Sequence, residues 1–197
     1  IIEKATTLRV DSLQEQLDYA LRLVAWSVVA PKCHVQIELI DILLNAGASP
    51  DGIAVDALVN RNFEAAKHLI DRGGKLTLAT AACLGRWSDA TRLARTAGSE
   101  EKQLSLTLAA LTGQPDALAF LVKQNVNLDK PSADLYSHAP ALHHAVASGS
   151  LEAVKVLVEA GASVDIKDTV YYSTPLGWAE YGKQDHIVDY LRNHGAQ

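Results

Sequence analysis

Three histidines and an aspartate near the C-terminus are the residue types most suited to binding a metal ion. His138, His143 and His144 could supply imidazole nitrogens and Asp168 a carboxylate oxygen, and transition metals accept both. Neighbouring residues on a helix point about 100° apart, so His143 and His144 cannot both face one ion. We therefore expect no metal and no other cofactor. A metal or small-molecule site near His138 and Asp168 is kept as an alternative.

A catalytic site would need an activated nucleophile or a cofactor-binding motif. The sequence contains no Gly-x-Ser-x-Gly elbow, phosphate-binding loop or dinucleotide fingerprint, and neither Cys33 nor Cys83 lies in a signature of a catalytic cysteine. Ser150, Asp168 and a histidine could be chosen as a catalytic triad, but no motif or spacing in the sequence singles them out. The sequence predicts no catalytic residues and a chain that is not an enzyme.

Large aromatic side chains gather in the same region. Tyr136, the pair Tyr171 and Tyr172, and then Trp178 and Tyr181 follow one another, and the last two are spaced i, i+3, one helical turn apart. Exposed aromatic residues often anchor protein interfaces, where each contributes about 2 kcal/mol or more. The alternative is that Tyr172 and Trp178 cover the core of the last structural unit. Both interpretations stay open at this point.

The composition is that of an ordinary globular protein, with 48% hydrophobic and 21% charged residues in 197. The longest apolar run, residues 23–30, is far shorter than the roughly 18 residues of a membrane span. The net charge of −5 disfavours nucleic-acid binding, and two cysteines are too few for a disulfide framework. We expect a cytoplasmic protein that binds neither nucleic acid nor a membrane.

The elements that position these residues follow from an internal repeat. Residues 140–161 and 174–195 share one pattern with a period of about 34 residues: a short Ala-rich segment, a Gly, and a longer aliphatic segment closed by Gly-Ala. Such self-similarity is typical of a solenoid whose units bury their apolar faces against their neighbours. Each unit is predicted to be a helix, a tight turn and a longer helix.

The same pattern can be followed towards the N-terminus through the ends of the longer helices. A helix often closes with one residue at positive φ, where Gly is favoured and Asn is the next most tolerant residue. The predicted ends are Gly47, Gly73, Gly98, Asn125, Gly161 and Gly195. The shorter helices are expected over residues 55–60, 78–84, 104–112, 142–148 and 175–181.

These ends predict a single repeat domain, 1–197. A helical cap over 1–31 is expected to begin at Asp11-Ser12 and to run to about Val29, before Pro31. The repeats are expected over 32–52, 53–76, 77–103, 104–139, 140–173 and 174–197.

The array repeats two short motifs: Ala141-Leu142-His143 and Thr174-Pro175-Leu176 begin two of its units, and Gly161-Ala162 and Gly195-Ala196 close them. These motifs resemble the Thr-Pro-Leu-His and the closing Gly-Ala of the ankyrin-repeat family, in particular its bacterial type. Pro140 stands in place of the family's Thr, and Thr107 and Gly177 in place of its His. The resemblance implies an all-α solenoid of about six units. It also implies β-hairpin fingers, for which only 125–140 and 161–174 leave room, and a structural His143 bonded within its turn.

The resemblance further implies a non-catalytic scaffold for protein–protein interaction. Its partner, whose identity is open, would dock on the concave and finger face of the C-terminal repeats of a monomer. The residues expected to contact it are Tyr136, His138, Asp168, Tyr171, Tyr172, Trp178 and Tyr181. Residues 104–197 hold 6 basic and 10 acidic side chains, so a basic or neutral partner surface is favoured. The alternative is a regulatory or targeting segment of a larger enzyme whose catalytic domain lies outside this chain.

Overall fold

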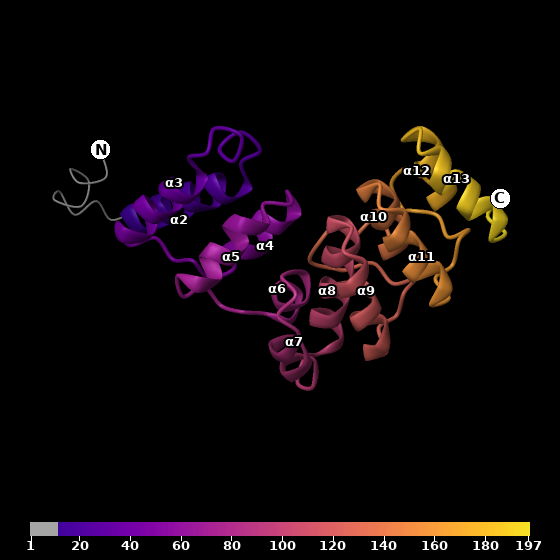
Figure 1. The fold of residues 1–197 in the computed structure, drawn as a ribbon, viewed down its shortest axis with the longest axis horizontal. Helices are drawn as coiled ribbons and strands as arrows, with labels where there is room; N and C mark the ends of the chain where they lie inside the picture. Colours follow the sequence, from indigo (N-terminus) through magenta and orange to yellow (C-terminus); the bar gives the residue numbers. More distant parts are fainter. Residues whose placement is uncertain (1–11) are drawn as a thin grey trace. The chain divides into compact units, whose positions relative to one another are not determined.

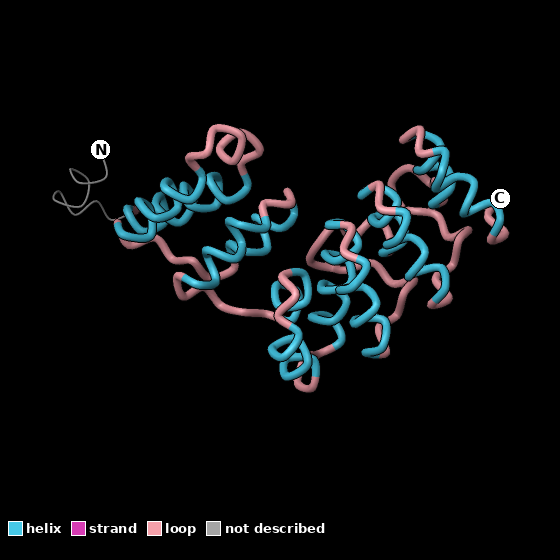
Figure 2. Tube along the Cα trace, viewed as in Figure 1, coloured by secondary structure: helices cyan, strands magenta, loops and turns pink. Residues whose placement is uncertain are grey.

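The computed structural model describes residues 12–197, in which α-helices alternate with short turns and loops (Figures 1 and 2). The chain divides into two compact units, Ile1–Leu76 and Thr77–Gln197, each described by itself below. The predicted role of Asp11 in starting the first helix lies outside the described residues. The division into one cap and six repeats of a single domain stays a prediction.

Two pairs of helices form the described part of the first unit, residues 12–76. They are α2 (Leu13–Trp26), α3 (Gln36–Asn45), α4 (Ile53–Val59) and α5 (Phe63–Asp71). α2 packs along both α3 and α4, burying Leu17, Leu21 and Ala25 in one stripe. The predicted cap thus packs as the first helix of a pair. It ends three residues before Val29, because the Ser27 hydroxyl accepts hydrogen bonds from the N–H groups of Val29 and Ala30, which forms a turn.

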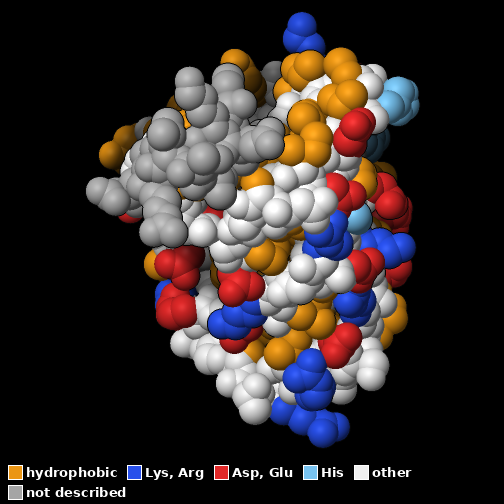
Figure 3. All heavy atoms as spheres, turned by 90° about the vertical axis from the view of Figure 1, so that its left-hand side faces the viewer, with side chains coloured by type: hydrophobic (Ala, Val, Ile, Leu, Met, Phe, Trp, Pro, Cys, Tyr) orange, Lys and Arg blue, Asp and Glu red, His pale blue; other side chains and the backbone are white. Residues whose placement is uncertain are grey.

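Charged side chains of both signs lie close together on the first unit. Arg22 pairs with Asp56 at 3.2 Å, and Arg72 pairs with Asp41. On the face seen in Figure 3, basic, acidic and hydrophobic side chains are interspersed.

Four further helix pairs form the second unit. The first members are α6 (Leu78–Cys83), α8 (Ser99–Thr112), α10 (Ala141–Ser148) and α12 (Pro175–Tyr181). The second members are α7 (Trp87–Ala94), α9 (Pro115–Leu121) with the 3-10 turn η1 (Val122–Gln124), α11 (Leu151–Glu159) and α13 (Asp185–Asn193). The first members stack in sequence order, and Ala109, Ala145 and Ala179 are fully buried between them. Small side chains at these positions allow successive helices to approach closely, and they come from the segments that the sequence shows to be Ala-rich.

The predicted helix ends are confirmed at five of six positions. Gly47, Gly73, Gly161 and Gly195 have φ between 92° and 104°, and Asn125 has φ 55°. The prediction for Gly98 is wrong, because its φ is −70° and it precedes α8, which begins five residues before the expected Leu104. The acidic residues of the first turn of α8 favour this earlier start, since they lie at the positive end of the helix dipole.

Two long loops of the second unit occupy the places expected for fingers. We name residues 126–140 the first finger and residues 162–174 the second finger. No strand occurs in either loop or elsewhere in residues 12–197, so the predicted β-hairpins are not found. The N–H of Asp168 bonds to the carbonyl of Ser173, and the N–H of Thr169 to that of His138 in the first finger. The N–H groups of Val170, Tyr171 and Ser173 at the tip of the second finger bond to the Asp168 side chain instead of to a neighbouring strand.

Candidate partner-binding site

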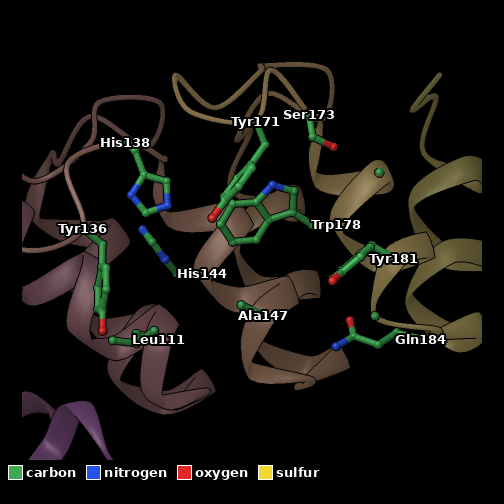
Figure 4. Close-up of a pocket in the computed structure, with 12 residues that line it drawn as sticks. Leu111, Tyr136, His138, His144, Ala147, Tyr171, Ser173, Trp178, Tyr181 and Gln184 are labelled. Carbon is green, nitrogen blue, oxygen red and sulfur yellow. The ribbon is translucent and has the colours of Figure 1, made fainter.

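A pocket with a volume of about 860 Å³ opens on the second unit, between the two fingers and helices α8, α10 and α12 (Figure 4). Half of its twelve lining residues are aromatic, counting two histidines, and none is Lys, Arg, Asp or Glu. The residues that line it are Leu111, Tyr136, His138, His144, Ala147, Tyr171, Ser173, Gly177, Trp178, Tyr181, Gly182 and Gln184. Five of the seven residues predicted from the sequence are in this lining.

His138 is the centre of an aromatic cluster in this pocket. Its ring centroid lies 6.2 Å from that of Tyr136, 5.9 Å from that of His144, 6.4 Å from that of Tyr171 and 6.0 Å from that of Trp178. The His138 and Trp178 rings are stacked, with 28° between their planes, whereas Tyr171 meets both edge-on. Rings from both fingers and from two helices therefore form one continuous surface.

Asp168 organises the second finger from inside. Its Oδ1 accepts hydrogen bonds from the N–H groups of Val170 (2.9 Å) and Tyr171 (2.6 Å). Its Oδ2 accepts from the N–H of Ser173 (3.1 Å) and from Nε1 of Trp178 (3.0 Å). Burial acts to raise the pKa of Asp168, but these four donors together lower it to about 2. The carboxylate is therefore ionised at neutral pH.

This arrangement differs from the expectation that the Asp168 side chain contacts a partner. Only 1% of Asp168 is exposed, and both carboxylate oxygens are occupied within the chain. The sequence does not reveal this because short-range backbone bonds of an aspartate depend on the turn that it closes. Asp168 can influence a partner only through the shape of the finger and through its charge.

Trp178 is fixed by the start of its helix as well as by Asp168. Thr174 accepts a hydrogen bond from the N–H of Gly177 at 3.2 Å and Pro175 follows, so α12 begins directly after the second finger. This places Trp178 one turn into the helix, half-buried beside His138 and 5.1 Å from the ring of His143. The indole is thus both part of the packing and part of the pocket.

The two adjacent histidines of α10 have structural roles. His143 donates from Nε2 to the carbonyl of Ser173 at 3.0 Å, and His144 donates to that of Ala139 at 3.1 Å. Burial lowers the pKa of His143, and it lowers the pKa of His144 to about 4, so both rings are neutral at pH 7. The bond of His143 reaches the second finger rather than closing its own turn. Within residues 12–197, no three His, Cys, Asp or Glu side chains are grouped to hold a metal ion.

The tyrosines differ in how they meet the pocket. Tyr136 is 45% exposed, Tyr171 is 71% exposed and Tyr181 at the rim is 93% exposed. Tyr172 is 75% exposed, has φ 53° and does not line the pocket. The alternative that Tyr172 covers the core of the last unit is therefore wrong, while half-buried Trp178 serves the core and the pocket together.

Seven of the twelve lining residues were not predicted as partner contacts, among them Leu111, Ala147 and Gln184. Leu111 and Ala147 lie two residues before Gly113 and Gly149, which end α8 and α10 with positive φ. This shared position in successive units is a signal that could have identified both. Gln184 precedes α13, and nothing in its sequence context distinguishes it from an ordinary helix-start residue.

Stacked helix pairs that present a loop-rimmed aromatic pocket define a helical repeat protein of the binding-scaffold class. The family model of ankyrin repeats in three copies matches residues 33–168 and 106–197, so the chain belongs to the ankyrin-repeat family. Ankyrin repeats are non-catalytic modules of protein interaction, and this agrees with the predicted scaffold function.

Two curated relatives share part of the array. The palmitoyltransferase ZDHHC13 of Homo sapiens and that of Pongo abelii are each 38% identical to this chain over 78 residues. The match takes in 40% of this chain but only 12% of the length of either relative. The enzymatic activity in their name is a property of those proteins. No helix in residues 12–197 of the present chain is long and apolar enough to cross a membrane.

Proposed function

We propose that the partner protein docks on the finger face of the second unit, over the pocket between α8, α10 and α12. The observation that carries this proposal is the aromatic lining, in which Tyr136, Tyr171 and Tyr181 are exposed around half-buried Trp178. Exposed aromatic side chains gain more than most residues when a partner covers them. The scaffold has no catalytic step and acts by holding these rings in place.

We propose that the packed helices and the hydrogen-bonded fingers hold the aromatic rings of the pocket in fixed positions before a partner binds. Leu142, Leu157 and Leu191 are almost fully buried in the helix pairs that carry the pocket. The bonds of Asp168 fix the second finger, and the bond from Thr169 to His138 joins it to the first finger. A preformed site loses less conformational entropy on binding, so more of the contact energy appears as affinity.

The proposal also covers the number of repeats, the oligomeric state, the cellular compartment and the charge of the partner. We keep the predicted division into a helical cap over 1–31 and six repeats over 32–197, in an array that acts as a monomer. Cys33 and Cys83 are both free thiols, which suits a reducing cytoplasm. The acidic balance of residues 104–197 favours a protein partner with a basic or neutral surface over nucleic acid.

Affinity capture with matched variants tests the surface. The double variant Tyr171→Ala/Tyr181→Ala removes two exposed pocket rings, whereas Tyr19→Ala/Tyr172→Ala removes two exposed tyrosines outside the pocket. Capture from native cell extract should lose a protein with the first variant and keep it with the second. A partner retained equally by wild type and both variants would show that the pocket is not the docking site.

A second candidate is a regulatory or targeting segment of a larger enzyme. The match to palmitoyltransferases, confined to 12% of their length, is the observation that supports it. Reading the complete open reading frame that contains these 197 residues tests it directly. A catalytic domain in the same frame would support this candidate, and a frame made of repeats alone would exclude it.

A further inference from the structure

Helix α2 of the first unit carries apolar side chains on two opposite sides. One side is the stripe that is buried against α3 and α4. The other side carries Tyr19, Leu23 and Trp26, of which 64%, 47% and 52% is exposed. Neighbouring residues of a helix point about 100° apart, so the centres of the two stripes lie roughly opposite each other. A helix that is apolar on both sides is typical of an interior layer, yet the described residues bury only one side of α2.

The exposed stripe has the spacing of a helix-packing face. Tyr19, Leu23 and Trp26 follow one another at i, i+4 and i+7, and α2 is an uninterrupted helix of 14 residues (Figure 2). Side chains at this spacing are the anchors by which one helix packs on another. Where nothing packs on the outer face of a repeat array, that face has to be polar for solubility. The outer face of α2 is not polar, which favours a further element that covers it.

Two charged residues flank the exposed stripe in a definite order. Glu15 lies in the first turn of α2 and Arg22 about two turns later, so both are on the same edge of the stripe. Both side chains are exposed, although Arg22 also contacts Asp56 at 3.2 Å. An occupant that pairs with both residues places a basic group beside Glu15 and an acidic group beside Arg22. An anionic lipid surface offers negative charge alone, which Glu15 would repel.

An α-helix that runs antiparallel to α2 has the required order of charges. Helices are stabilised by acidic residues near their N-terminus and by basic residues near their C-terminus. In the antiparallel orientation the C-terminal end of the occupant lies beside Glu15 and its N-terminal end beside Arg22. Apolar packing along the stripe and both charge pairs are then satisfied by one helix.

A second copy of α2 has the same order of charges but is too short at one end. Suppose that Glu15 of one copy lay opposite Arg22 of the other. Because Trp26 is four residues beyond Arg22, it would lie opposite a position four residues before Glu15, which precedes the start of α2 at Leu13. The Trp26 side chains of both copies would then stay uncovered. A longer helix from another protein covers the whole stripe.

We propose that the exposed side of α2 binds an amphipathic α-helix of a partner protein, antiparallel to α2 and with its acidic N-terminal end beside Arg22. This is a second interaction surface of the scaffold. It lies on the first unit and does not depend on the pocket of the second unit.

Synthetic helical peptides test this proposal on the complete 197-residue chain. The main peptide has leucines spaced i, i+4 and i+7, acidic residues in its first turn, lysines in its last turn, and about 20 residues so that it is helical in isolation. One comparison peptide exchanges the two charged ends, and another has the same composition in scrambled order. Binding is followed by the ¹⁵N–¹H signal of the Trp26 indole, with Trp87 and Trp178 as references. The main peptide should shift Trp26 alone, to saturation, and bind severalfold more tightly than the charge-exchanged peptide.

Paired variants connect this binding to α2. Tyr19→Ala/Leu23→Ala should weaken the main peptide at least about tenfold, because two exposed apolar contacts are lost. Tyr171→Ala/Tyr181→Ala removes two exposed rings of the pocket and should leave the affinity unchanged. The surface on α2 and the pocket can therefore fail independently.

Other results would overturn the proposal. No shift of Trp26, or a scrambled peptide that binds as tightly as the main peptide, would exclude a helix-binding face, and equal binding of the charge-exchanged peptide would contradict the antiparallel orientation. A dimer of wild type in sedimentation equilibrium that Tyr19→Ala/Leu23→Ala abolishes would assign the surface to a second copy instead. Vesicles of phosphatidylcholine and phosphatidylserine that shift Trp26 when the main peptide does not would assign it to a lipid surface.

Discussion

Nε1 of Trp178 donates a 3.0 Å hydrogen bond to Oδ2 of Asp168, ten residues earlier in the chain. This bond joins the first turn of α12 to the loop that leads into it. The same carboxylate accepts three backbone N–H groups of that loop, so the position of the indole and the shape of the second finger are coupled. A partner that displaces the indole of Trp178 should therefore also change the conformation of the second finger.

Stability should depend on the ionisation of Asp168. The pKa of this carboxyl is lowered from its ordinary 3.8 to about 2 in the folded chain. Between pH 3.8 and about pH 2 the unfolded state therefore binds more protons than the folded state. The ionised Asp168 carboxylate thus stabilises the fold in full above about pH 4, and this contribution is lost as the pH falls towards 2. The shift corresponds to roughly 2 kcal/mol. Urea unfolding at pH 7, 4 and 3 measures it.

Asp168→Asn is the matched variant for this prediction. It keeps the shape of the side chain but replaces one acceptor oxygen by an N–H₂ group that would face two donors. The variant should be less stable than wild type at pH 7 by roughly 2 kcal/mol, with the difference shrinking in acid. A constant difference from pH 7 to pH 3 would contradict the role given to the charge.

A second pH dependence should come from His144. Burial lowers its pKa from 6.5 to about 4, so between these values the unfolded state binds the proton and the folded state does not. Stability should therefore fall as the pH falls below about 6.5, by roughly 2 kcal/mol between pH 6.5 and 5. His144→Gln, which can still donate to Ala139, should lose this component of the curve. An unchanged curve in the variant would show that His144 is not its source.

The packing core and the pocket rim should respond differently to truncation. Leu157 is fully buried, so Leu157→Ala should cost about 2–5 kcal/mol of unfolding free energy. Tyr171 is 71% exposed, and Tyr171→Ala should change the stability by less than about 0.5 kcal/mol. Chemical unfolding followed by circular dichroism measures both. A Tyr171→Ala chain that fails to fold would contradict the binding role given to this ring.

The sequence predicts the repeated helix pairs well because their signals are local. Glycines at helix ends, small residues between first helices and aliphatic stripes each depend on a few neighbouring residues. The aromatic pocket is predicted in part for the same reason, since Trp178 and Tyr181 share a helix. The loops are predicted poorly. Whether Asp168 points outwards or gathers four donors depends on a turn that includes Tyr172 at positive φ, and no local pattern specifies it.

Gly98 and Gly161 differ in their backbone φ angles. Replacing each of them by serine tests whether the chain needs a positive φ at that position. Gly98 is at the N-cap of α8 with φ −70°, and Gly161 follows α11 with φ 95°; neither has a neighbour that an added Cβ would meet. Gly98→Ser should stabilise the chain by up to about 1 kcal/mol, because a hydroxyl there can accept from the N–H of Glu101. Gly161→Ser should cost about 1 kcal/mol, because a side chain disfavours positive φ. Urea unfolding of both variants would give shifts of opposite sign, and equal shifts would show that Gly98 closes α7 after all.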